Sequence, residues 1–152
     1  MENLLTINDL SVSFGRGAGE LKAVTSMRLQ IEKGQIVALV GESGSGKTVT
    51  ALSVTRLLPY PLAWHPGGSI KFDGQELMGA TEPKMRAIRG NRISMIFQEP
   101  LNSLNPLHSV EKQIKEVLHL HKRMSDGKAR ERVKELLDLV GMPEASPRLH
   151  AM

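Results

Sequence analysis

The stretch Gly41-Glu42-Ser43-Gly44-Ser45-Gly46-Lys47-Thr48 decides the fold of this chain. It fits the pattern G-x-x-x-x-G-K-[ST] and follows the apolar run Ile36–Val40, which is typical of a strand buried on both faces in a parallel sheet. The segment Thr48–Leu58 contains no Gly or Pro and is stopped by Pro59, so we predict a helix there. A glycine-rich turn between a buried strand and a helix is the context of a phosphate-binding loop.

The residue types in this turn each suit the binding of a polyphosphate. Glycines allow successive backbone N–H groups to curl around an anion, and the start of the helix adds its positive end. Lys47 would place a cation on the terminal phosphate oxygens, and Thr48 would offer its hydroxyl to Mg²⁺. We predict phosphate binding by Gly41, Glu42, Ser43, Gly44, Ser45, Gly46, Lys47 and Thr48. An ordinary glycine-rich turn is the weaker interpretation, because the pattern arises by chance in about one chain in two hundred of this length.

The residues before the loop alternate between apolar and polar side chains. This period of two covers residues 5–14 and returns at 27–31, with the glycine-rich turn Gly15–Gly19 between them. We therefore predict that the two segments form an antiparallel pair.

The residues after the helix change from strand-like to helical patterns. We predict a loop over 59–68, a strand and hairpin over 70–74, and a short apolar strand over Ile93–Phe97. Apolar residues then recur at helical spacing over 110–118 and 133–140, before a stop at Gly141. Trp64 lies in the predicted loop, where it is either a packing residue or a contact residue.

Composition limits the classes of protein that this chain can belong to. Its 152 residues fit one ordinary domain, and the absence of Cys excludes a disulfide-stapled module. No apolar run approaches the ~18 residues of a spanning helix. A net charge of +4 with three Phe, one Trp and one Tyr argues against nucleic acid as a partner.

Two segments resemble the ATP-binding subunits of ABC transporters. These are the phosphate-binding loop and the run Ile93-Ser94-Met95-Ile96-Phe97-Gln98-Glu99-Pro100-Leu101-Asn102-Ser103-Leu104-Asn105-Pro106. Within that family the chain is most similar to the dipeptide, oligopeptide and nickel importer branch, above all to microcin C and peptide uptake ATPases. The resemblance covers about residues 5–149.

The resemblance implies an α/β fold of the P-loop NTPase class, namely an ABC-type nucleotide-binding domain truncated before its signature motif. Its parts would be an antiparallel β-subdomain, a partial core sheet and the start of a helical subdomain. We expect one partial ATP-binding domain over residues 1–152. Residues 1–99 would form the β-subdomain and phosphate-loop core, and residues 100–152 would form the Q-loop and the start of the helical subdomain.

The resemblance also assigns roles to two residues outside the loop. Gln98 matches the glutamine of the Q-loop, which reaches Mg²⁺ and the attacking water, so it is our candidate catalytic residue and a second metal ligand beside Thr48. Phe14 occupies the place of the aromatic that stacks on adenine. Without the resemblance, a glutamine after a buried strand, such as Gln98, is more often an ordinary loop residue. The alternation of Phe14 with Val12 also fits a core residue.

The implied cofactors are ATP and Mg²⁺. The implied partners are a second ATP-binding domain, transmembrane permease subunits and, indirectly, a periplasmic peptide-binding protein. The implied location is cytoplasmic, on the cytoplasmic face of the bacterial inner membrane.

Several family motifs have no counterpart in these 152 residues: the signature, the Mg²⁺-organising aspartate, the catalytic glutamate and the switch histidine. We therefore expect the parent family to hydrolyse ATP but this chain alone to be inactive and marginally stable. The alternative is a non-hydrolysing fragment that binds nucleotide or permease. Another P-loop NTPase, such as a kinase or GTPase, is disfavoured because no Asn-Lys-x-Asp motif is present.

Overall fold

The computed structural model describes residues 3–98 and 104–142, which divide into two compact units. The first unit ends at Arg86 and the second begins at Ala87. The subdomain boundary predicted at residues 99 and 100 lies outside the described residues.

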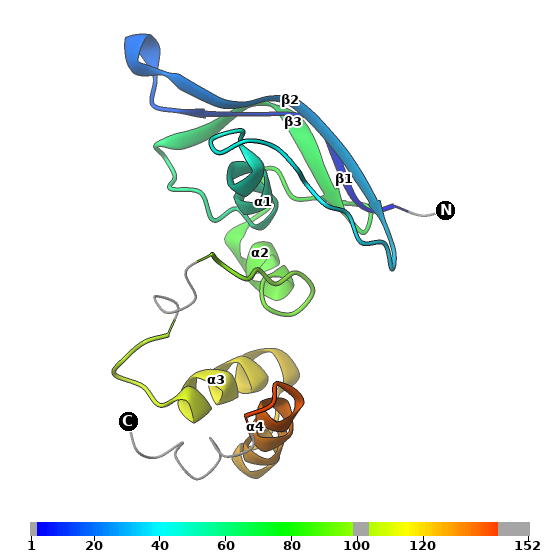
Figure 1. The fold of residues 1–152 in the computed structure, drawn as a ribbon, viewed down its shortest axis with the longest axis vertical. Helices are drawn as coiled ribbons and strands as arrows, with labels where there is room; N and C mark the ends of the chain where they lie inside the picture. Colours follow the sequence, from blue (N-terminus) through cyan, green and yellow to red (C-terminus); the bar gives the residue numbers. More distant parts are fainter. Residues whose placement is uncertain (1–2, 99–103, 143–152) are drawn as a thin grey trace. The chain divides into compact units, whose positions relative to one another are not determined.

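The first unit is built on a four-stranded sheet (Figure 1) with the strand order β2-β1-β3-β4. The strands are β1 (Asn3–Phe14), β2 (Leu21–Glu32), β3 (Ala63–Phe72) and β4 (Gln75–Glu76). All three pairings are antiparallel. The pair predicted from the alternation of residues 5–14 and 27–31 is confirmed, and a 3-10 turn, η1 (Gly17–Gly19), joins its two strands.

One face of the sheet carries the core of this unit. Ile7, Leu10, Val12 and Ile70 are at most 1% exposed. Helix α1 (Lys47–Thr55) lies on one face of the sheet in Figure 1 and buries Thr50, Ser53, Val54 and Thr55. The helix predicted over 48–58 is therefore confirmed. It ends three residues early because Arg56 adopts a left-handed conformation with φ 52°.

Strand β3 corrects the loop predicted over 59–68, because it continues through Pro66, Gly67 and Gly68. Its pairing with β1 is irregular there, and a bulge can accommodate a proline, which has no N–H to donate. Gly68 has φ +108°, and a Cβ at this position would lie 2.5 Å from the Cα of Leu10, so only glycine permits the close approach.

Trp64 lies in β3 and packs against the turn that joins β1 to β2. Its Nε1 donates a hydrogen bond of 2.8 Å to the carbonyl of Gly15 in that turn. The guanidinium of Arg16 lies 5.2 Å from the centre of the indole ring, within the range of a cation–π contact.

The two strands predicted over Ile36–Val40 and Ile93–Phe97 are wrong for the described residues. No named strand includes either segment, and Ile36, Val40 and Ile96 are 98%, 89% and 95% exposed. A strand forms only when at least one neighbouring strand pairs with its backbone, and no strand of the described residues pairs with either segment. The partial core sheet is therefore absent from the described residues, and the exposed apolar run Ile36–Val40 is an aggregation hazard.

The second unit contains a pair of helices, α3 (Val110–Lys122) and α4 (Asp126–Leu139), while the shorter α2 (Glu82–Ile88) spans the boundary between the units. The helical spacing over 110–118 and 133–140 is confirmed. Ser109 caps α3 by accepting a hydrogen bond from the amide of Lys112. The apolar contact between the helices is made by Leu118, Ala129, Val133 and Leu137. No helix in the described part of the chain is long and apolar enough to cross a membrane.

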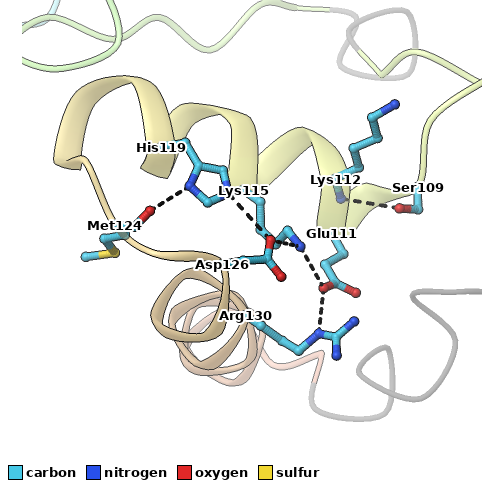
Figure 2. Close-up of polar contacts among 8 residues, drawn as sticks. All are labelled: Ser109, Glu111, Lys112, Lys115, His119, Met124, Asp126 and Arg130. Atoms are coloured by element: carbon cyan, nitrogen blue, oxygen red, sulfur yellow. Dashed lines mark hydrogen bonds and ion pairs between the residues drawn. The ribbon is translucent and has the colours of Figure 1, made fainter.

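A chain of alternating charges links α3 to α4 (Figure 2). The carboxylate of Glu111, which is 4% exposed, accepts a 2.9 Å hydrogen bond from Arg130 Nε and lies 3.6 Å from Lys115 Nζ. Lys115 Nζ also lies 2.5 Å from Asp126 Oδ1. The hydrogen bond from Lys115 lowers the pKa of Asp126, and the bond to Glu111 raises the pKa of Arg130. These contacts connect the two helices through side chains of opposite charge.

A half-buried carboxylate, that of Glu76, holds the β3–β4 hairpin in the first unit. Glu76 Oε2 accepts a 2.5 Å hydrogen bond from Ser69 Oγ, and Oε1 accepts bonds from the amides of Ile70 and Met78. Burial alone would raise the pKa of Glu76, but these hydrogen bonds together lower it below its ordinary value.

Acidification should therefore weaken the hairpin. Because the pKa of Glu76 is lower in the folded chain, its contribution is complete above the unfolded pKa of about 4.3 and is lost as the pH falls through the folded pKa. We expect Glu76→Gln to cost about 1 kcal/mol at pH 7. Urea unfolding followed by Trp64 fluorescence between pH 3 and 7 measures this. An equally steep acid loss in Glu76→Gln would show that another carboxylate is responsible.

Candidate functional site

The glycine-rich stretch Gly41–Gly46 folds into a compact loop at the start of α1. Gly44 and Gly46 have φ values of +81° and +83°, a left-handed conformation that glycine adopts at no steric cost. The amide of Ser45 donates to the carbonyl of Glu42 at 3.2 Å, which closes the turn. Gly46 is the N-cap of α1, so the loop leads directly into the positive end of the helix.

The ammonium of Lys47 lies over this loop. Its Nζ donates to the carbonyls of Gly41 and Glu42 at 2.7 and 2.6 Å and to Ser45 Oγ at 3.2 Å. A Cβ at position 41 would lie 2.7 Å from the same Ser45 Oγ, so a larger residue there would force the Ser45 side chain to move. The arrangement concentrates a cation, loop amides and a helix N-terminus at one place, which suits a polyphosphate.

The remaining predicted loop residues lie at the surface. Glu42 and Ser43 are exposed at the tip of the loop. Thr48 is exposed in the first turn of α1, directly after Lys47. A threonine hydroxyl is a hard oxygen donor of the kind that Mg²⁺ accepts, so the donor chemistry at this position fits the predicted metal. The described residues contain no group of three or more carboxylate or imidazole side chains that could hold a metal ion.

A pocket of about 390 Å³ lies between the loop and β2. This volume is within the usual range for small-ligand sites. Gly41, Ser45 and Lys47 line it from the loop, and the opposite wall is the stretch 23–28 of β2. The pocket thus contains three of the loop residues predicted from the sequence, together with a strand that the motif does not contain.

Phe14 does not line this pocket. Phe14 is half-buried at the end of β1, paired with Leu21 of β2 and Ala63 of β3. Gln98 is exposed and belongs to the second unit. The remainder of the predicted Q-loop, Glu99 and Pro100, lies outside the described residues. The roles of Phe14 and Gln98 stay predictions.

Three residues next to the loop were not predicted from the sequence: Ala23, Val24 and Thr50. A Cβ at position 46 would lie 2.7 Å from the carbonyl oxygen of Ala23 and 2.9 Å from Val24 Cγ2. Thr50 is 4% exposed, and its Oγ1 donates to the carbonyl of Gly46 at 2.9 Å. Thr50 lies four residues after Gly46, and this helical spacing could have indicated its contact with the Gly46 carbonyl. No local sequence pattern could have indicated Ala23 and Val24, because β2 is distant from the loop in sequence.

Known proteins similar to this chain include ATP-binding proteins of transport systems. The family model described as "ABC transporter" matches residues 24–151. The chain is 52% identical over 148 residues to a peptidoglycan transport ATP-binding protein of Agrobacterium fabrum, covering 97% of this chain and 27% of that protein. It is 43% identical over 147 residues to the oligopeptide transport ATP-binding protein OppD of Bacillus subtilis, covering 97% of this chain and 41% of that protein.

The fold is similar to that of solved ATP-binding cassettes. One is a dimeric cassette in a post-hydrolysis state bound to ADP and Pi, with a TM-score of 0.76 and 23% identity. This likeness covers 88% of the chain and 56% of the cassette. The chain thus spans well under half the length of the two curated relatives above and just over half of the solved cassette.

Proposed function

This chain belongs to the ABC transporter family, and from that premise we propose that it binds the phosphates of ATP, together with Mg²⁺, through the loop Gly41–Thr48. The observation that carries the proposal is the position of the Lys47 ammonium, within 2.7 Å of two loop carbonyls at the start of α1. A cation held there by neutral carbonyls can exchange them for negatively charged phosphate oxygens, which are stronger acceptors.

Different residues of the loop bind the phosphates and the metal. The amides of Gly44 to Lys47 and the positive end of α1 hold phosphate oxygens, while Lys47 neutralises the terminal phosphates. Thr48 contributes its hydroxyl to Mg²⁺, which supplies charge neutralisation between the phosphates when bound. The pocket beside the loop supports this arrangement because Gly41, Ser45 and Lys47 line it together.

Two further roles complete the proposal. The ring of Phe14 contacts the adenine face, and Gln98 orients the attacking water and reaches the metal in a complete ATPase. Both roles come from the resemblance to the family.

The similar proteins named above are ATP-binding proteins of peptidoglycan and oligopeptide transport, which suggests a role for the whole protein. We propose that the sequence forms the ATP-binding part of a peptide importer. Its partners would be a second ATP-binding domain, transmembrane permease subunits and, indirectly, a periplasmic peptide-binding protein. It would lie at the cytoplasmic face of the inner membrane, attached through the permeases.

The proposal is tested by titrating the 152-residue chain with ATP, inorganic triphosphate and AMP in the presence of Mg²⁺, using calorimetry. Because the loop recognises the phosphates, ATP and triphosphate should both bind, and AMP should bind much more weakly. Equal affinities for ATP and AMP, or no binding of triphosphate, would contradict the proposal.

Phe14→Ala separates base recognition from phosphate recognition. If the ring contacts adenine, the substitution should weaken ATP binding by about threefold to tenfold and leave triphosphate binding unchanged, because only the purine loses a stacking face. The same titrations measure it. An identical loss for both ligands would show that Phe14, half-buried between Leu21 and Ala63, acts only in packing.

A further inference from the structure

The strand β2 forms a wall behind the phosphate-binding loop. Gly46 is buried, and the space where its Cβ would lie is filled by the carbonyl of Ala23 at 2.7 Å and by Val24 Cγ2 at 2.9 Å. The contact joins residues that are more than twenty positions apart in the sequence. The loop therefore rests on a part of the chain that its own motif does not include.

Gly46 connects the loop to α1, so its backbone conformation sets the direction in which the helix begins. Its φ of +83° turns the chain from the loop into α1, and its carbonyl accepts bonds from both the amide and the hydroxyl of Thr50, at 2.8 and 2.9 Å. A rotation here would redirect the amides of the first helical turn and the side chain of Lys47. An anion site needs its donors held to within roughly 0.5 Å.

Val24 is held in place by the pairing of β1 with β2. In the sheet it pairs with Val12, which is fully buried, whereas Val24 is only half-buried and lines the pocket beside Ser45 and Lys47. Valine has a stiff, β-branched side chain that suits a strand, so Cγ2 keeps its place against Gly46.

We propose that Val24 is a positioning residue for phosphate binding: its side chain, anchored by the β1–β2 pairing, holds Gly46 in the left-handed conformation that aims the loop and Lys47 at a polyphosphate. This inference rests on the proposed function and concerns the same site. It adds that the affinity for phosphate is set in part by a residue that lies outside the loop motif.

The test compares three variants of the 152-residue chain with the parent. Val24→Ala removes the contact with Gly46, and Val24→Thr keeps the shape of the side chain. Leu29→Ala truncates another half-buried residue of β2, one that pairs with Ile7 and does not line the pocket. Calorimetry with inorganic triphosphate and Mg²⁺ gives the affinity, and urea unfolding gives the stability of each variant.

We expect Val24→Ala to weaken triphosphate binding by about threefold to tenfold, within the usual range of coupling between groups in contact. Val24→Thr should restore the parent affinity, and Leu29→Ala should lose stability without losing affinity. Parent-like affinity in Val24→Ala, an equal loss in Leu29→Ala, or a failure of Val24→Thr to restore binding would each overturn the inference while the proposed function stands. A parent chain that binds no triphosphate would overturn both.

Discussion

Replacing Lys47 by alanine is expected to weaken ATP binding by roughly 10- to 150-fold, the equivalent of ~1.5–3 kcal/mol for a hydrogen bond to a charged group. The ammonium is the cation that the loop itself carries, held on the carbonyls of Gly41 and Glu42 and on Ser45 Oγ. Its removal leaves only backbone amides, the helix end and Mg²⁺ to balance the phosphate charge. It also removes three contacts that tie the loop together.

Titration of ATP and of inorganic triphosphate measures this loss, which should be the same for both ligands because Lys47 acts on phosphate. Lys22→Ala is the matched control, since it removes the same charge from an exposed position on β2 that does not line the pocket. Equal titration curves for Lys47→Ala and the parent would remove the loop from the binding site.

Neutralising Glu111 is expected to cost the helix pair α3–α4 about 1–3 kcal/mol of stability. The carboxylate is 4% exposed and accepts the bond from Arg130 Nε, while Lys115 lies 3.6 Å away (Figure 2). In Glu111→Gln, Lys115 and Arg130 lose a shared counter-charge whose own side chain is only 6% exposed. The apolar contact between the helices is small, so the loss should be visible against it.

Amide hydrogen exchange along α3 and α4 measures the stability of this pair directly in the full chain. Glu116→Gln is the matched control, because Glu116 belongs to the same helix but is exposed. Faster exchange in Glu111→Gln alone is the expected result. If both variants exchange at the parent rate, the charge chain contributes nothing to holding the helices together.

Local patterns in the sequence were enough to predict many of the secondary-structure elements of this protein and its glycine-rich loop. The loop Gly41–Thr48, the helix that follows it, and the helices over 110–122 and 126–139 are specified by residues close in sequence, through glycine conformation, helical period and capping. The β1–β2 pair is specified in the same way, because two alternating segments joined by a short glycine-rich turn have one obvious pairing. The family resemblance follows from the same short segments.

Contacts between distant residues decided the rest. Ile36–Val40 has the composition of a buried strand, but a strand exists only where neighbouring strands satisfy its backbone, and the described residues provide none. Strand β3 passes through Pro66 and Gly68 because β1 accommodates it with an irregular register. Val24 lies behind Gly46 because the sheet carries β2 past the loop, and no spacing along the chain encodes that meeting. A residue's own neighbours in sequence set its backbone preference, whereas its burial and its partners depend on which remote segments fold against it.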